Sequence, residues 1–352
     1  MPKLSLLIKP ASSMCNLRCT YCFYHALAET RTTKSYGLMP LDVLETIIKK
    51  TLSFATEECT LAFQGGEPTL AGLAFFHKLI EYESQYNINN AAINHAIQTN
   101  GTLLDDDWCQ FFAEHNFLVG LSLDGTAETH DCNRINAQGQ GTHQAVMKAA
   151  RLLQKHKVSF NILTVLNAAT ARRPRKIYEF YRKNGFDYMQ FIPIIHDAEK
   201  PTFALSNERL ADFLIQTHLL YNDDLTKGNR VSIRYFDELY NMLNGGQPSA
   251  CDMRGTCSCQ FVIEADGSVF PCDFYCTDEW LLGSIKDLGF PELLNSKNAQ
   301  GFLKPTESPP EKCRRCEYQK LCRNGCRRLH STETGINRYC EGFKALFNDM
   351  LK

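Results

Sequence analysis

The chain has 352 residues, 44% of them hydrophobic, and a formal net charge of -1, which does not favour nucleic acid or an anionic membrane as a partner. No apolar run approaches the roughly 18 residues of a membrane span, and the opening MPKLSLLIKPASS is too short and too quickly interrupted for a signal peptide. We therefore expect a cytoplasmic protein, in which sixteen cysteines are better explained by metal sites than by disulfides.

Short apolar runs alternate with helical patterns in the first part of the chain. The predicted strands are residues 4–10, 60–64, 94–99, 118–123, 160–165 and 189–195, and the predicted helices are 41–55, 73–86, 106–115, 142–156 and 176–184. A strand and a helix about every 30 residues favour a parallel sheet. Six such units are too few for an eight-stranded barrel, so a partial barrel or an open sheet is left. In either, the chemistry belongs at the carboxyl ends of the strands.

The first four predicted strands each end in a segment that carries cysteine, glycine or polar residues. These segments are the loop with Cys15, Cys19 and Cys22, QGGEP at 64–68, QTNG at 98–101, and SLDG at 122–125 with Arg134 beyond it. One such turn is weak evidence, because turns need glycine anyway. Four in succession at the same edge of a sheet indicate a common site.

The sequence pattern changes after residue 235, where cysteines become frequent and the regular alternation of strands and helices fades. A connecting segment over 196–228, with a helix opened by Ser206 as its N-cap, leads into a region crowded with cysteines. Within it, FVIEADGSVFPC at 261–272 predicts a hairpin that turns at 265–267, with Cys272 on the returning strand. The rest is loop-rich and would need metal clusters to hold it together. We expect two domains, 1–235 and 236–352.

Three cysteines in the first loop, with no fourth beside them, allow two interpretations. His25 lies three residues past Cys22 and could complete a Cys3His zinc site. Alternatively, the three thiolates hold a four-iron cluster and leave one iron open to a small molecule. The spacing alone favours the cluster over zinc without deciding between them.

The context of this loop resembles the radical S-adenosylmethionine (SAM) enzymes. The resemblance rests on C-x3-C-x2-C with Tyr21 before the last cysteine, after the first of six strands, and on GGEP after the second. It implies a partial (β/α)6 barrel in which the open iron binds the amino and carboxylate groups of SAM, and the 5′-deoxyadenosyl radical released from SAM removes hydrogen from carbon. The residues that it implies as SAM contacts are Tyr21, Gly66, Ser122, Arg134 and the backbone near Ile195. Taken singly, each has an ordinary structural explanation.

Ten cysteines follow residue 250, and CRRCEYQKLCRNGC gives C-x2-C-x5-C-x3-C. One fully ligated cluster needs four thiolates and two need eight, while zinc ribbons stay open as the alternative. The pattern resembles the twin-cluster (SPASM) domain of peptide-modifying radical enzymes, which makes three [4Fe–4S] clusters in all. The implied ligand sets are Cys251, Cys257, Cys272 and Cys326 for the first auxiliary cluster, and Cys313, Cys316, Cys322 and Cys340 for the second. Cys259 and Cys276 are then spare, and the isolated Cys59, Cys109 and Cys132 are expected to be small buried hydrophobes.

Several longer segments resemble the anaerobic sulfatase-maturating enzymes. They are SLLIKPASS, CTYCFYH, AFQGGEPTLAG, QTNGTLL, NRVSIRYFD, CQFVIEADGSVFPCDFY and GCRR. The resemblance implies oxidation of a cysteine or serine in a Cys/Ser-x-Pro/Ala-x-Arg motif of a nascent or unfolded sulfatase to Cα-formylglycine, with flavodoxin or ferredoxin as the electron donor. Two features depart from the pattern, Cys276 after CDFY and Pro193-Ile194-Ile195 after the sixth strand.

Asp273 follows Cys272 and occupies the position where this family carries its catalytic aspartate, so the resemblance implies that it is the general base. By residue type His25 and His330 are rival bases, and an aspartate that caps a turn is the structural alternative. Two other classes of function stay open from the sequence. They are a radical enzyme that forms thioether or carbon–carbon crosslinks in peptides, and a non-catalytic iron–sulfur or zinc protein.

Overall fold

The computed structural model describes residues 3–195, 204–304 and 309–352, so that residues 196–203 of the predicted connecting segment lie outside it. The chain divides into two compact units, each assembled from separate segments. The first unit consists of Met1–Ser122, Arg134–Phe160 and Ser258–Lys304. The second consists of Leu123–Asn133, Asn161–Cys257 and Pro305–Lys352.

The strands of the first unit run in the order β10-β9-β8-β1-β2-β3-β4. They are β1 (Leu4–Ile8), β2 (Glu58–Phe63), β3 (Ala92–Thr99), β4 (Leu118–Ser122), β8 (Val262–Ile263), β9 (Ser268–Phe270) and β10 (Gly283–Ser284). From β1 to β4 each strand is parallel to the next. Strand β2 follows from its alternation, because Cys59, Leu61 and Phe63 are all fully buried on one side.

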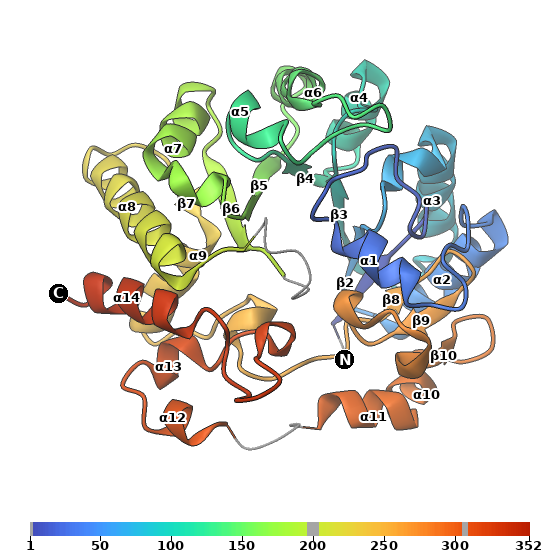
Figure 1. Cartoon of the computed structure of the whole chain (residues 1–352). Helices are drawn as coiled ribbons and strands as arrows, with labels where there is room; N and C mark the ends of the chain where they lie inside the picture. Colours follow the sequence, from blue (N-terminus) through green and yellow to red (C-terminus); the bar gives the residue numbers. More distant parts are fainter. Residues whose placement is uncertain (1–2, 196–203, 305–308) are drawn as a thin grey trace. The chain divides into compact units, whose positions relative to one another are not determined.

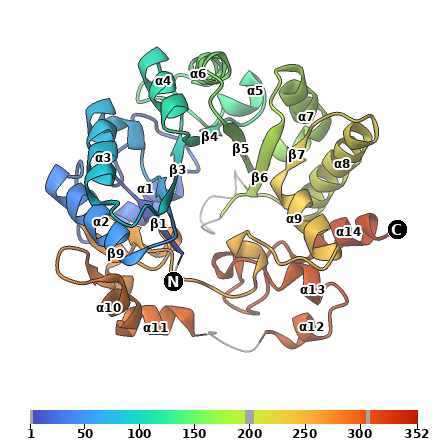
Figure 2. The same cartoon turned by 180° about the vertical axis from the view of Figure 1, so that it is seen from behind.

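Helices follow the strands of this unit in the predicted rhythm. They are α1 (Phe23–Glu29), α2 (Leu41–Phe54), α3 (Leu73–Tyr86), α4 (Asp106–Glu114), α6 (His143–Lys155), α10 (Phe290–Asn295) and α11 (Lys297–Leu303). In α2, Val43, Leu44, Ile47 and Ile48 recur at helical spacing and are all buried. Helices α2 and α3 lie side by side in both views (Figures 1 and 2).

The predicted hairpin is present, with β8 antiparallel to β9. Its pairing with β1 was not predicted: β8 lies parallel to β1, with Leu7 opposite Val262 and Ile8 opposite Ile263. Cys272 lies just beyond β9, not on the returning strand as expected. The parallel pairing attaches the segment that carries Asp273 to the strand that leads into the cysteine loop.

The second unit contains β5 (Phe160–Leu166), β6 (Tyr188–Pro193) and β7 (Ser232–Ile233), of which β6 is parallel to both others. Its helices are α5 (Ala127–His130), α7 (Pro174–Lys183), α8 (Asn207–Thr226), α9 (Arg234–Leu243), α12 (Glu311–Arg314), α13 (Gln319–Cys322) and α14 (Cys340–Met350). Ser206 caps α8 as predicted, since its hydroxyl accepts a hydrogen bond from the Arg209 N–H. Asn207 ties α8 to α14 by accepting from the Gly342 N–H at 2.8 Å.

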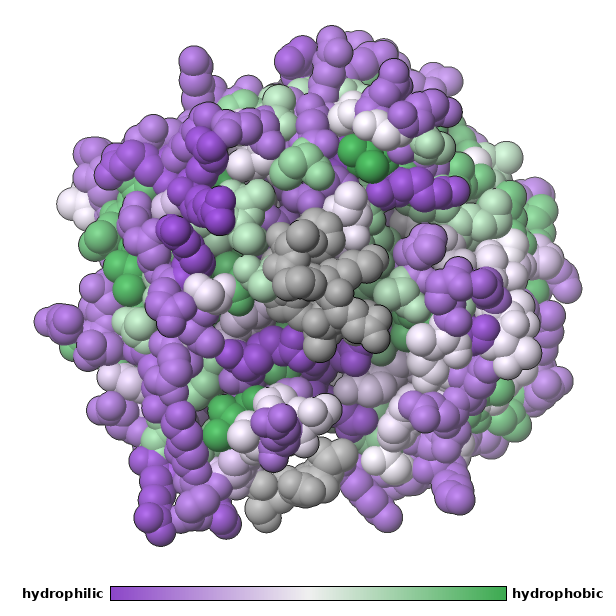
Figure 3. Space-filling view, in the orientation of Figure 1, coloured by the Kyte–Doolittle hydropathy of each residue, from purple (hydrophilic) through white to green (hydrophobic). Residues whose placement is uncertain are grey.

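All six predicted strands and all five predicted helices are present, with ends that differ by up to two residues. The predicted domain boundary near residue 235 falls at the start of α9 and stays a prediction. On the face drawn in Figure 3, hydrophilic side chains cover most of the described surface, with hydrophobic ones in small groups between them. Among the helices that the structure describes, none is both long and apolar enough to cross a membrane.

Candidate functional site

The loop between β1 and α1 carries Cys15, Cys19 and Cys22, all partly exposed, and Cys22 is the residue that precedes α1. The Leu17 N–H points at the Cys15 sulfur, 3.3 Å away. Burial raises the pKa of the Cys15 thiol to about 12, so this thiol is protonated at neutral pH until a metal displaces the proton. A partly open loop with three thiols fits a cluster that must also bind a small molecule.

The zinc alternative needs a compact ligand set. Four ligands on one zinc ion place their sulfur atoms about 3.8 Å apart, because each Zn–S bond is about 2.3 Å. Within the part of the chain that the structure describes, no group of three or more His, Cys, Asp or Glu residues has the geometry to hold a single metal ion. His25, the expected fourth zinc ligand, is exposed. A four-iron cluster does not require its thiolates to lie this close together.

The QGGEP segment after β2 packs against the cysteine loop through its backbone. The Glu67 N–H donates to the Met14 carbonyl at 2.8 Å. Gly66 has φ +52°, and a Cβ atom added there would lie only 2.1 Å from the same carbonyl oxygen. Only glycine fits both the left-handed conformation and this approach. Gly66, a predicted SAM contact, is therefore held directly beside the cysteine loop.

The QTNG segment after β3 reaches the same loop. The buried Glu67 carboxylate accepts from the Thr99 hydroxyl at 2.7 Å and from the Asn100 N–H at 2.7 Å. The Asn100 side chain in turn donates to the Asn16 side chain at 2.9 Å. Burial raises the pKa of Glu67, and its hydrogen bonds oppose that rise. Glu67 thus connects the ends of two strands to the residue that follows Cys15.

Two predicted SAM contacts meet in the first unit. The Arg134 guanidinium lies over the Tyr21 ring, 5.5 Å from its centre, and Arg134 is 7% exposed, so it is not the solvated surface charge that was its alternative explanation. Ser122 ends β4, and its hydroxyl accepts from the Gln98 side chain at 3.1 Å. Ile195 belongs to the second unit and follows β6, so its contact with SAM stays a prediction.

Asp273 lies in a short 3-10 turn (Asp273–Tyr275) and is 5% exposed. Its Oδ2 atom accepts from the Tyr24 hydroxyl at 2.5 Å and from the Gln64 side chain at 3.1 Å. Its Oδ1 atom is buried and has no hydrogen-bond partner among the described residues. Burial raises the pKa of Asp273, while the positive charge of Lys9 and the Tyr24 hydrogen bond lower it. Its carboxylate is thus held by side chains from distant segments, which the turn-capping alternative does not explain.

The two histidines considered as alternative general bases, His25 and His330, lie in environments that differ from that of Asp273. His25 is exposed. His330 belongs to the second unit, and its Nε2 atom lies 2.9 Å from the Asn324 carbonyl. Burial lowers the pKa of His330, which favours its neutral form.

A buried group of charges beside Asp273 was missed from the sequence. Lys9 is 1% exposed, and its ammonium lies 2.8 Å from the Glu264 carboxylate and 5.1 Å from the centre of the Tyr24 ring. Arg31 bonds to the same Glu264 oxygen at 2.6 Å. A Cβ atom added at Gly65 would lie only 2.4 Å from the Cε atom of Lys9. The sequence feature that could have revealed this group is the presence of Lys9 and Glu264 within otherwise apolar strand patterns.

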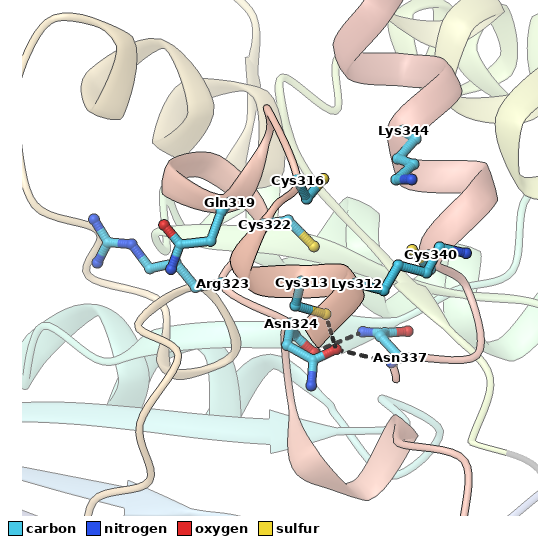
Figure 4. Close-up of a pocket in the computed structure, with 10 residues that line it drawn as sticks. All are labelled: Lys312, Cys313, Cys316, Gln319, Cys322, Arg323, Asn324, Asn337, Cys340 and Lys344. Atoms are coloured by element: carbon cyan, nitrogen blue, oxygen red, sulfur yellow. Dashed lines mark hydrogen bonds between the residues drawn. The ribbon is translucent and has the colours of Figure 1, made fainter. Parts of the chain in front are cut away.

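In the second unit, one hollow is lined by Cys313 of α12, Cys322 of α13, Cys340 at the start of α14, and Cys316 between α12 and α13 (Figure 4). The hollow has an empty volume of about 390 Å³, part of it open to solvent. The four residues assigned to the second auxiliary cluster therefore line the same hollow.

The other predicted ligand set is divided between the units, because Cys251, Cys257 and Cys326 belong to the second and Cys272 to the first. That assignment stays a prediction. Cys276 is fully buried against Val262 and Phe270, and its thiol donates to the Cys272 carbonyl at 3.6 Å.

The three isolated cysteines differ in how far they are buried. Cys59 and Cys109 are fully buried, as expected. Cys132 is exposed, so the expectation of a buried hydrophobe was wrong there. It lies in the loop between α5 and Arg134, where its neighbours Asn133 and Arg134 are buried and the Cys132 side chain is not.

Comparison with known proteins shows the family of this chain. The Radical SAM superfamily matches residues 10–181, and an iron–sulfur cluster-binding (SPASM) domain matches residues 251–317. A cysteine-type anaerobic sulfatase-maturating enzyme of Clostridium perfringens is 46% identical over 99% of this chain and 96% of its own length. The chain belongs to the anaerobic sulfatase-maturating enzymes. A serine-type member from Bacteroides thetaiotaomicron is 31% identical over 98% of this chain and 88% of its own length.

Solved structures agree with the family. Native anSMEcpe with bound AdoMet superposes with a TM-score of 0.94 at 45% identity, over 99% of this chain and 97% of the other. A further structure of anSMEcpe carries both AdoMet and a peptide, and matches with the same TM-score at 44% identity. Streptococcus suis SuiB bound to its precursor peptide has a TM-score of 0.65 at 18% identity, over 92% of this chain and 72% of its own, which shows a shared fold alone.

Membership confirms three expectations. The fold class is α/β, a partial (β/α)6 barrel followed by a loop-rich C-terminal region. The protein is a radical SAM enzyme of the sulfatase-maturating family. Its expected cofactors, three [4Fe–4S] clusters and SAM, agree with both family matches and with the AdoMet-bound structures.

We predict about twelve irons per chain in anaerobically purified enzyme, from three four-iron clusters. Replacing Cys15, Cys19 and Cys22 together by alanine should leave about eight, because two clusters keep their ligands. Iron and zinc analysis of both proteins tests this. Mainly zinc in the parent enzyme, or twelve irons in the triple variant, would contradict it.

Gly66→Ala should impair SAM cleavage, because a Cβ atom there meets the Met14 carbonyl. We expect 5′-deoxyadenosine formation under dithionite to fall by roughly tenfold or more, since small misplacements of reacting groups are costly. Gly139→Ala is the matched control, because Gly139 has φ +76° with nothing within 4 Å of the added atom. Equal rates in the two variants would show that the contact is unimportant.

Proposed function

We propose that this chain oxidises a cysteine of a sulfatase polypeptide to Cα-formylglycine, and that serine is the poorer substrate. The observation that carries the proposal is its 46% identity, over 99% of the chain, to a cysteine-type sulfatase-maturating enzyme. Cysteine-type relatives are more similar than serine-type ones, at 46% against 31%. The target is taken to lie in an unfolded or nascent sulfatase with a Cys/Ser-x-Pro/Ala-x-Arg motif.

The residue assignments form part of the proposal. Cys15, Cys19 and Cys22 would hold the cluster that binds SAM, with Tyr21, Gly66, Ser122, Arg134 and Ile195 around the SAM molecule. When bound, this cluster and SAM supply a carbon-centred radical that removes a hydrogen atom from the target Cβ. The Arg134 guanidinium offers donors to carboxylate or ribose oxygens, and its placement on the Tyr21 ring fixes its orientation.

The oxidation would remove a hydrogen atom from Cβ, a proton from sulfur and one electron, which an auxiliary cluster would accept. The resulting thioaldehyde would react with water to give the aldehyde and hydrogen sulfide. A base must take the sulfur-bound proton, and Asp273 is suited to this task. Two donors, Tyr24 and Gln64, hold its Oδ2 atom. They leave Oδ1 without a partner in a buried position, where it can accept a proton from a substrate thiol.

The setting of the reaction also follows as a proposal. A low-potential flavodoxin or ferredoxin would deliver the electron that starts each turnover. The enzyme would work in the cytoplasm, where its substrate is still unfolded and where thiols stay reduced.

Asp273→Asn should separate SAM cleavage from peptide oxidation. We expect all three clusters and continued 5′-deoxyadenosine formation, while formylglycine falls by roughly a hundredfold or more, because asparagine cannot take the proton. Mass spectrometry of the peptide and chromatography of 5′-deoxyadenosine measure the two outputs. Asp278→Asn is the control, since Asp278 is an exposed carboxylate that bonds to Thr32. Formylglycine at near the parent rate from Asp273→Asn, with clusters intact, would exclude Asp273 as the base.

A pair of peptides tests the choice of substrate. Under anaerobic conditions the Cys-x-Pro-x-Arg peptide should give formylglycine at least roughly tenfold faster than its serine counterpart, because a thiol gives up its proton to a carboxylate more easily than a hydroxyl. A faster serine peptide would reverse the proposed preference. A thioether or carbon–carbon crosslink in place of formylglycine would overturn the proposed function.

A further inference from the structure

A buried hydrogen bond connects the start of α14 with the end of β6 inside the second unit. The Tyr339 hydroxyl donates to the Ile194 carbonyl at 2.8 Å. Tyr339 is 1% exposed and Ile194 is 5% exposed, so water does not compete for either group. The two residues belong to segments far apart in the sequence, and Tyr339 directly precedes Cys340.

On one side, Tyr339 is connected to the hollow lined by Cys313, Cys316, Cys322 and Cys340. The Tyr339 N–H donates to the Asn337 side chain at 2.9 Å, and the Cys340 N–H donates to the Asn337 carbonyl at 2.9 Å. The Asn337 N–H donates to the Asn324 side chain at 2.9 Å, and the same Asn324 oxygen lies 3.6 Å from the Cys313 sulfur (Figure 4). The position of the tyrosine therefore depends on how this cysteine set is arranged.

On the other side, Tyr339 holds a single peptide group. The Ile194 N–H donates to the Leu166 carbonyl at 2.9 Å, which continues the pairing of β5 with β6 by one residue. The Ile194 carbonyl and the Ile195 N–H share one planar peptide group. A donor fixed on the carbonyl therefore also fixes the direction of the Ile195 N–H, the backbone expected to contact SAM.

We propose that Tyr339 is a positioning residue that couples the second auxiliary cysteine set to SAM binding, by fixing the peptide group between Ile194 and Ile195. The inference rests on the proposed function, because that function makes the Ile195 backbone a SAM contact. A purely structural role is the rival explanation, since a buried hydroxyl on a carbonyl stabilises a fold in any case. The two differ in what they do to SAM affinity.

Tyr339→Phe in the full-length, anaerobically reconstituted enzyme removes only the hydroxyl. We expect the dissociation constant of SAM and the KM for SAM to rise about threefold to tenfold, the range for one net hydrogen bond. At saturating SAM, kcat for 5′-deoxyadenosine should stay within about twofold of the parent, with about twelve irons retained. Unchanged SAM affinity, or a lower kcat with unchanged KM, would overturn the proposal.

Tyr221→Phe is the matched control. Tyr221 is 4% exposed in the same unit, and its hydroxyl donates to Asp237 at 2.6 Å, between α8 and α9. This variant loses a buried hydroxyl without a link to Ile194, so its SAM affinity should equal that of the parent. An equal loss of affinity in Tyr221→Phe would assign the effect to general destabilisation and refute the coupling.

A double-mutant cycle tests the link to the cysteine set. Cys313→Ala should also weaken SAM binding while some SAM cleavage continues, and adding Tyr339→Phe should weaken it little further, because both changes release the same peptide group. Strictly additive losses would refute the link.

The inference can fail while the proposed function stands. If the parent enzyme makes formylglycine and Tyr339→Phe binds SAM normally, only the role of Tyr339 is refuted. A parent enzyme that binds SAM but makes no formylglycine refutes only the function.

Discussion

The ion pair of Lys9 with Glu264 is the interaction on which the proposed active site depends. Both side chains are almost completely buried, so removing Glu264 leaves the charges of Lys9 and Arg31 without their carboxylate, at a cost of about 3–5 kcal/mol. Lys9 follows β1 and Glu264 follows β8, so the pair joins the strand before the cysteine loop to the hairpin before Asp273. The same ammonium faces the Tyr24 ring, whose hydroxyl holds the Asp273 carboxylate. Cofactor loop and candidate base are thereby held in one rigid arrangement.

The local features of this protein were accessible from its sequence. Strands and helices followed from periodicity, and the cysteine loop and QGGEP followed from spacing. The roles of Tyr24, Gln64 and Lys9 were not accessible, because they depend on the parallel pairing of β1 with β8, which no local pattern encodes. Asp273 came from family resemblance alone. Cys276 illustrates the same limit: its proximity in sequence to Cys272 does not reveal that it points into the core.

The two buried carboxylates of the proposed site, Glu67 and Asp273, differ in how many hydrogen bonds they accept. Glu67 is buried and accepts four hydrogen bonds, from Thr69, Thr99 and Asn100, so it has no free oxygen with which to take part in chemistry. Asp273 is as deeply buried but keeps one oxygen without a partner among the described residues. The number of donors that reach each carboxylate thus separates the structural role of Glu67 from the reactive role proposed for Asp273.

The pairing of β1 with β8 also has a consequence for how the chain is made. While the ribosome is still extending the chain, β1 has an open edge and Lys9 has no Glu264 to neutralise it. Such non-local pairings form slowly, and an unpaired strand edge is prone to association with other chains. The first unit can close only after Ser258–Lys304 has been synthesised. This edge of β1 therefore stays unpaired until most of the chain has been synthesised.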